Sequence, residues 1–184
     1  MGRVVPTINT ARLTLRAMTL SDFDRYAQLW ADARVVGDIG VPLRDRAESW
    51  GAFLKNAGHW QLMGYGQWAI EPHRAGQIAG HVGFFQAKRD WGADFDAYPE
   101  AGWVLGPTAQ GQGFGPEAAN AAHDWFDRVV TGPLVCVVAH ENARSLALAE
   151  RLGYTALRDS PDGSAVLMLR RRAPEGGPLS GGIN

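Results

Sequence analysis

A glycine-rich segment between a predicted strand and a predicted helix constrains the fold of this chain more than any other feature. Residues 110–115 read Gln-Gly-Gln-Gly-Phe-Gly, after the apolar stretch 103–105 and before Pro116. Glycine adopts backbone angles that other residues avoid, so consecutive N–H groups in such a turn can converge on one anion. Pro116 suits the first turn of a helix, whose N-terminus adds free N–H donors and a positive dipole end. The segment therefore predicts either a phosphate-binding turn or a purely structural one.

Two common phosphate-binding motifs are excluded by the spacing of these glycines. No Gly-Lys-Ser/Thr sequence ends the turn, as the P-loop of a nucleoside triphosphatase requires. The glycines are separated by single residues, whereas the dinucleotide-binding motif is Gly-x-Gly-x-x-Gly. About 20 residues beyond Gly111, where a dinucleotide fold places its ribose-binding acid, stand Val130 and Thr131. Nicotinamide cofactors are therefore disfavoured.

The rest of the chain alternates between strand and helix patterns. Residues 12–18 alternate apolar and polar side chains, as a half-buried strand does, whereas apolar residues at helical spacing follow Ser21 and Gly115. Predicted strands cover residues 12–18, 67–71, 78–85, 101–105, 134–139, 155–157 and 165–169. Predicted helices cover residues 21–30, 45–57 (closed by Gly58), 116–130 and 143–152 (closed by Gly153). The order β-α-α-β-β-β-α-β-α-β-β predicts one α/β domain over residues 1–172, followed by an aperiodic, flexible tail at 173–184.

The charge balance and the cysteine content exclude several classes of protein. The 184 residues include 18 Lys and Arg against 19 Asp and Glu, so we expect no basic surface for nucleic acid or anionic lipid. One cysteine and five scattered histidines provide neither a disulfide framework nor a structural zinc site. The N-terminal residues lack a signal-peptide pattern, and no apolar run is long enough to span a membrane. We therefore expect a metal-free cytoplasmic protein, a monomer or a homodimer, that binds neither nucleic acid nor membrane.

Several ordered motifs resemble those of one enzyme family. Residues 110–115 match Q/R-x-x-G-x-G/A, the pyrophosphate-binding signature of the GNAT N-acetyltransferases. The segments 10–16, 100–107, 114–118 and 142–154 look like the RimJ/RimL-type branch, so that the likeness covers roughly residues 8–170. The resemblance implies the GNAT fold, a mixed and mostly antiparallel sheet with a central splayed pair of parallel strands, flanked by about four helices.

The resemblance implies acetyl-CoA as the co-substrate and identifies residues that would bind it. The pantetheine arm would pair with the backbone of residues 103–105, and the pyrophosphate would lie on the N–H groups of residues 110–115. Asn142 matches an asparagine that contacts the pantetheine arm, but it is also a good N-cap for the following helix. Gln112 stands where relatives often have a basic residue, so weaker phosphate contacts are expected. The implied cofactor-binding residues are Trp103, Val104, Leu105, Gln110, Gly111, Gln112, Gly113, Phe114, Gly115, Asn142 and Ser145.

The implied reaction is direct attack of an amine on the thioester carbonyl. Glu100 precedes the pantetheine strand, where many relatives have a carboxylate, and is the candidate general base; a surface glutamate is the alternative. A backbone N–H near Val104 or Leu105 would stabilise the oxyanion. Many relatives have a general-acid tyrosine seven residues after the asparagine, but here that position is Ala149, so protonation of the thiolate falls to Ser145, to water or to no group. A catalytically silent CoA-binding domain and an enzyme for a longer acyl group are the competing hypotheses.

The sequence leaves the amine acceptor open: a protein N-terminus, another peptide or a small molecule. Loop 88–100 combines aromatic residues with three aspartates, which predicts either a site for a cationic amine or an ordinary packed loop. Segments 37–43 and 58–63 are further candidates for the acceptor wall. Cys136 and Tyr154 are predicted core residues, because the first lies in an apolar strand and large aromatic side chains usually pack.

Overall fold

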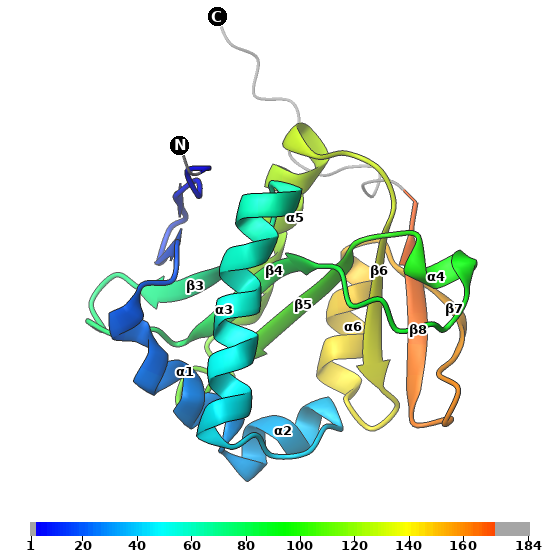
Figure 1. Cartoon of the computed structure of the whole chain (residues 1–184), viewed down its shortest axis with the longest axis horizontal. Helices are drawn as coiled ribbons and strands as arrows, with labels where there is room; N and C mark the ends of the chain where they lie inside the picture. Colours follow the sequence, from blue (N-terminus) through cyan, green and yellow to red (C-terminus); the bar gives the residue numbers. More distant parts are fainter. Residues whose placement is uncertain (1–2, 172–184) are drawn as a thin grey trace, which may run out of the picture.

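The computed structural model describes residues 3–171, in which helices cover both faces of one sheet (Figure 1). The predicted tail, residues 173–184, lies outside the described residues. The strands are β1 (Ile8–Asn9), β2 (Leu13–Arg16), β3 (Gln67–Pro72), β4 (Gly80–Phe85), β5 (Glu100–Leu105), β6 (Leu134–Ala139), β7 (Thr155–Asp159) and β8 (Ala165–Arg170). The helices are α1 (Phe23–Trp30), α2 (Ala33–Ile39), α3 (Arg46–Met63), α4 (Ala93–Asp96), α5 (Phe114–Val129) and α6 (Ala143–Arg151), with a 3₁₀ helix (Leu20–Asp22) before α1.

The sheet has the expected mixed topology, and every predicted strand and helix is present. The strand order is β1-β2-β3-β4-β5-β6-β8-β7. Neighbouring strands are antiparallel except for β5 and β6, which are parallel. The predicted α/β class with a mostly antiparallel sheet is therefore confirmed.

The parallel strands β5 and β6 pair at their first residues and then diverge. Within residues 3–171, Glu100 and Val135 are their only Cα partners, whereas β4 and β5 pair at six positions. Figure 1 shows the gap that opens between β5 and β6, with α6 behind it. The predicted splayed pair is confirmed, and it places an unpaired backbone edge in the middle of the sheet.

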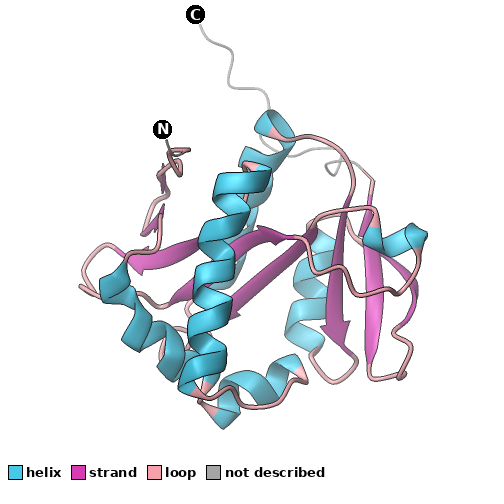
Figure 2. Ribbon diagram, in the orientation of Figure 1, coloured by secondary structure: helices cyan, strands magenta, loops and turns pink. Residues whose placement is uncertain are grey.

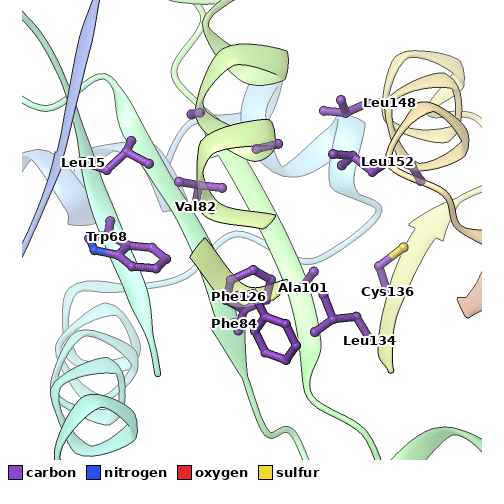
Figure 3. Close-up of a cluster of buried hydrophobic side chains, with 14 of the residues drawn as sticks. Leu15, Trp68, Val82, Phe84, Ala101, Phe126, Leu134, Cys136, Leu148 and Leu152 are labelled. Carbon is purple, nitrogen blue, oxygen red and sulfur yellow. The ribbon is translucent and has the colours of Figure 1, made fainter. Parts of the chain in front are cut away.

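The helices divide between the two faces of the sheet (Figure 2). Helices α1, α2 and α3 pack on one face in a cluster that includes Val104, and α5 and α6 pack on the other in a larger cluster that includes Trp103 and Leu105. Adjacent residues of β5 therefore contact different helical layers, because side chains alternate along a strand. Figure 3 shows part of the larger cluster, with Phe126 of α5 against Phe84 of the sheet.

Some short elements were not predicted from the sequence. β1, α2, α4 and the 3₁₀ helix are each too short to establish a hydrophobic period. With α2 and α4 the described residues contain six α-helices, more than the roughly four implied by the resemblance.

Helix α3 is longer than predicted, because Gly58 does not end it. Asp45 and Glu48 form a capping box at its N-terminus. Gly58 lies inside the helix, and the C-cap is Gly64, whose φ is +77°. The prediction that the helix closes at Gly58 is therefore wrong. A glycine C-cap is defined by its left-handed conformation, which residue identity alone does not reveal.

Alanine substitutions at these two glycines test the extent of α3. A Cβ at Gly58 meets no atom within 4 Å, so Gly58→Ala is expected to raise the free energy of unfolding by about 0.5–1 kcal/mol, the usual helix-propensity gain. Gly64→Ala is the matched control and should lower it by about 1–2 kcal/mol, because alanine is strained at positive φ. Urea denaturation measures both. Destabilisation by Gly58→Ala would place the end of the helix at Gly58.

Candidate functional site

A cavity of about 520 Å³ lies at the divergence of β5 and β6 and extends to the wall formed by α1, the end of α2 and α3. The predicted site residues that line it are Glu100, Trp103, Val104, Asn142 and Ser145. Leu105 and residues 110–115 are not in its lining, among the residues that the structure describes; they continue from the end of β5 into α5. The structure thus brings the predicted catalytic residues together and places the glycine turn beside them along the same chain segment.

The backbone of β5 presents hydrogen-bonding groups to the gap at alternate residues. Gly106 N–H donates to the carbonyl of Ala79 on the β4 side, and the carbonyl of Pro99 accepts from Val135 N–H on the β6 side. Because these directions alternate along a strand, Trp103 and Leu105 N–H point toward β6, and Val104 N–H points toward β4. The candidate oxyanion donors are therefore the N–H groups of Trp103 and Leu105 and not that of Val104.

At two of its three glycines, the turn has the positive-φ backbone conformation that its composition predicted. Gly111 and Gly113 have φ angles of +74° and +78°, and Gly113 is the N-cap residue of α5. A Cβ at Gly111 would meet nothing within 4 Å, so glycine is needed there for its conformation and not for space. Gly115 differs, because it lies inside α5.

Two arginines that the sequence analysis missed lie against this turn. Arg12, before β2, donates from Nη1 to the carbonyl of Gln112 over 2.8 Å, and its guanidinium lies 4.9 Å from the centre of the Phe114 ring. Arg144 of α6 donates to Oε1 of Gln110 over 3.3 Å. Arg12 also pairs with Glu117 of α5, with 2.6 Å between Nη2 and Oε2, whereas Arg144 forms none of the ion pairs found within residues 3–171. The turn therefore has one neutralised arginine and one without an ion pair beside it. No local pattern could reveal them, because both come from distant parts of the sequence.

Asn142 and Ser145 are held in place by hydrogen bonds. Asn142 is the N-cap of α6: its Oδ1 accepts from Ser145 N–H over 3.0 Å, and its Nδ2 donates to the carbonyl of Asp38 over 2.7 Å. Ser145 Oγ accepts from Nε1 of Trp103 over 3.1 Å. That bond uses the oxygen as an acceptor and leaves the hydroxyl proton of Ser145 free to donate.

Glu100 is buried in the cavity wall and paired with an arginine. Its side chain is 6% exposed, so the alternative of a surface glutamate is wrong. Arg89 donates from Nε and from Nη2 to the two carboxylate oxygens, each over 2.9 Å. The role of Glu100 as general base stays a prediction, and the structure adds Arg89 as the group that holds the carboxylate in position.

A buried histidine on β4 forms a further part of the cavity wall that the sequence analysis missed. His81 Nε2 accepts a hydrogen bond from Nε1 of Trp30 over 3.2 Å, and its ring packs against Tyr26. The guanidinium of Arg44 lies 3.5 Å from the centre of the Trp30 ring. Among the described residues, His81 Nδ1 has no hydrogen-bond partner. A histidine in an apolar strand usually belongs to the core, so its sequence context gave no signal.

Loop 88–100 combines features of both alternatives, because Trp91 and Arg89 line the cavity while other side chains of the loop are packed. Phe95 is buried in a cluster with β6 and β8, and Asp94 pairs with Arg158. Asp96 accepts the backbone N–H groups of Arg89, Trp91 and Gly92, which hold its pKa below the usual value against the effect of burial. These two aspartates are thus engaged within the protein.

The other predicted segments divide between wall and core. Gly40 and Val41 line the cavity, as does His59, which belongs to α3 and not to a loop. Cys136 and Tyr154 are buried as predicted, and burial raises the pKa of both. The described residues include no group of three His, Cys, Asp or Glu side chains that could hold a metal ion, and none of their helices is long and apolar enough to cross a membrane.

Comparisons with known proteins point to one family. A sequence model described as an acetyltransferase (GNAT) domain matches residues 12–155. The uncharacterized N-acetyltransferase p20 of Bacillus licheniformis is 27% identical over 151 residues, which cover 80% of this chain and 82% of that protein. The crystal structure of an acetyltransferase from Agrobacterium tumefaciens superposes with a TM-score of 0.78 at 31% identity, covering 91% of this chain and 95% of that one. A Salmonella typhimurium protein solved with its cofactor acetyl-CoA shares the fold, with a TM-score of 0.68 at 19% identity and coverage of 92% and 99%.

The lowered pKa values of two buried histidines should make the stability of the folded protein depend on pH. Burial lowers the pKa of His81 from 6.5 to about 3 and that of His123 from 6.5 to about 4. Above pH 6.5 these rings are neutral in both the folded and the unfolded protein. Below pH 6.5 the rings bind protons in the unfolded chain but stay neutral in the folded protein until the pH reaches their lowered pKa values. The free energy of unfolding should therefore decrease as the pH is lowered from 6.5 to 4, by up to about 1.4 kcal/mol per pH unit for each histidine.

Urea denaturation across this pH range measures the slope. His123→Gln should reduce it by the share of one histidine, whereas His73→Gln, at an exposed position, is the control and should leave it unchanged. An equal slope in His123→Gln and in the unmodified protein would contradict the assignment.

Proposed function

We infer the function of this chain from one premise: it belongs to the GNAT acetyltransferase family, whose reaction is acetyl transfer. We propose that the acetyl donor is acetyl-CoA and that the acceptor is a primary amine, on a peptide or protein N-terminus or on a small molecule. The observation that carries this proposal is the unpaired edge of β5 that faces the gap.

The residues around this edge fit a CoA thioester. Backbone groups of Trp103 face β6 where no strand pairs with them, and extended amides such as those of pantetheine can complete an open strand edge. The next backbone acceptor, the Leu105 carbonyl, already accepts from Nε2 of Gln110. The positive-φ turn would then receive the pyrophosphate, with Arg144 as the cation without an ion pair beside it, while Arg12, paired with Glu117, holds the turn through the Gln112 carbonyl.

The transfer needs three groups from this chain. The nitrogen lone pair of the amine attacks the carbonyl carbon, the N–C bond forms, the C–S bond breaks, and the nitrogen loses one proton. In our proposal Glu100 takes this proton, directly or through water, the N–H of Trp103 or Leu105 stabilises the oxyanion, and the Ser145 hydroxyl donates to the departing thiolate. Ala149 is fully buried in the core, so its position supplies no acid.

A silent CoA-binding domain is the second candidate. The pairing of both Glu100 oxygens with Arg89 favours it, because the two oxygens that a general base would use already accept hydrogen bonds from the guanidinium. An enzyme for a longer acyl group is a variant of the first proposal, and turnover with acetyl-, propionyl- and succinyl-CoA separates the two.

Binding and turnover of acetyl-CoA test the proposal. Calorimetry should detect binding, and thiol release should depend on an added primary amine. Gly113→Ala should weaken binding about tenfold, since a strained residue at the turn displaces its N–H groups. Gly132→Ala is the matched control, because Gly132 also has positive φ, at +99°, but follows the far end of α5. Binding without amine-dependent thiol release would favour the silent domain, and lack of binding would refute both.

Substitution of Glu100 tests the proposed base. Glu100→Gln should lower kcat/KM by about 10²-fold or more and change the acid-side limb of its pH profile, the usual result when a general base is lost. Arg89→Gln is the companion variant: it removes the partner and keeps the carboxylate, so it should retain more activity than Glu100→Gln. A pH profile of Glu100→Gln that matches the unmodified enzyme would remove Glu100 from this role.

A further inference from the structure

The wall of the cavity on the side of α1 and α3 contains an arginine without an ion pair, as judged over the described residues, and a buried histidine with an unused hydrogen-bond donor. We propose that the acceptor is an amine that carries an anionic group, a carboxylate or a phosphate, several bonds from the reacting nitrogen, and that Arg44 and His81 bind this group. The inference rests on the proposed amine acetylation and narrows its substrate class.

His81 provides a hydrogen-bond donor that the protein itself does not use. The indole Nε1–H of Trp30 can only donate, so His81 Nε2 accepts and the neutral ring carries its proton on Nδ1. Burial keeps the ring neutral, with a pKa lowered to about 3. Within residues 3–171 this Nδ1–H has no acceptor, although the side chain is buried and lines the cavity. Buried donors are nearly always paired, and in our proposal an acceptor atom of the ligand pairs with this one.

Arg44 provides a positive charge that no carboxylate of the described chain neutralises. It forms none of the ion pairs found within residues 3–171. Its guanidinium is held against the Trp30 ring that also bonds His81, and its charge contributes to the lowered pKa of His81. The guanidinium also hydrogen-bonds the Tyr26 hydroxyl, but it has five N–H donors, which leaves others for an anionic oxygen.

The remaining charges of the cavity wall favour an anion over a second cation. Arg89 and Glu100 neutralise each other, and Lys55 on α3 adds a further cation without an ion pair, as judged over the described residues. Asp162 lies in the turn between β7 and β8, where hydrogen bonds from Ser160 and Ser164 lower its pKa to about 2. The wall of α1 and α3 therefore carries uncompensated positive charge, which suits an anionic acceptor and opposes a polyamine.

The position of His81 limits the distance between the anionic group and the amine. His81 and Val104 are direct partners across β4 and β5, with a typical Cα separation of about 5 Å. In the proposed function the thioester lies along the adjacent β5 edge at Trp103 and Leu105. The gap lies on the β6 side of β5 and His81 on the β4 side, so the backbone of His81 is about two strand spacings, roughly 10 Å, from the reacting centre. The side chains of His81 and Arg44 span part of this distance, which leaves several bonds between the anionic group and the amine, as in an ω-amino acid or an aminoalkyl phosphate.

A panel of paired acceptors tests the inference. Free α-amino acids and ω-amino acids of increasing length are compared with their own amides, which keep the amine and lose the charge. Aminoethyl phosphate and aminoethylphosphonate form the phosphate arm. Spermidine and an N-terminally free peptide amide complete the panel. We expect kcat/KM for the preferred anionic acceptor to exceed that of its uncharged counterpart by at least about tenfold, close to the 1.4 kcal/mol that corresponds to a tenfold difference. The same preference should appear without turnover, as tighter calorimetric binding of the N-acetyl amino acid than of its amide.

Variants assign this preference to the two residues. Arg44→Gln should raise KM for the anionic acceptor about tenfold and lower kcat/KM for the amide much less. Arg44→Lys should restore part of the loss, and Arg46→Gln is the control at a neighbouring exposed arginine. His81→Gln retains an acceptor for Trp30 and removes the Nδ1–H donor, so it should weaken the anionic acceptor selectively. The Arg44 variants decide the matter if His81→Gln does not fold.

The results separate this inference from the function on which it rests. Equal or better turnover of amides, peptide amides or spermidine would overturn the inference and leave amine acetylation standing. The same selectivity in Arg44→Gln as in the unmodified enzyme would also overturn it. Turnover of no acceptor, together with measured acetyl-CoA binding, would overturn the proposed function and this inference with it.

Discussion

The divergence of β5 from β6 after one paired position is the constraint on which the rest of the structure depends. Parallel strands that separate leave backbone donors and acceptors without partners inside the protein, a costly arrangement unless another group completes them. Helices on both faces keep the gap open as a cavity, and the bond from Trp103 to Ser145 ties β5 to α6 across it. The unpaired edge is thus a maintained feature of the fold and not a defect of the sheet.

Strand alternation lets β5 serve two different kinds of chemistry. Trp103 and Leu105 contact the layer of α5 and α6, which holds the glycine turn, Ser145 and Arg144. Val104 contacts the layer of α1, α2 and α3, where His81 and Arg44 lie. In the proposed function the donor therefore lies along the open edge of β5, and the acceptor approaches from the face that carries His81 and Arg44.

Much of the fold could be predicted from local sequence patterns, and the predictions that were wrong or missing also have local causes. Alternation in β2, the apolar run of β6 and the capping box of α3 each depend on neighbouring residues, so their elements were predicted correctly. The end of α3 was wrong because glycine is compatible both with a helix interior and with a left-handed cap, and only the backbone conformation at Gly64 decides between them. The short helices α2 and α4 contain too few turns for a period to show.

For the candidate site, local sequence was enough to establish the strand, the positive-φ glycines and the N-cap at Asn142, because each depends on the backbone preferences of consecutive residues. The pairing of Glu100 with Arg89 and the approach of Arg12 and Arg144 to the glycine turn required the folded chain. The presence of Arg44 and His81 in the wall of one cavity also required the folded chain. Such contacts depend on how elements that are distant in sequence pack together. Packing against a diverging pair of strands produces no periodic pattern in the sequence, so these contacts could not be predicted from it.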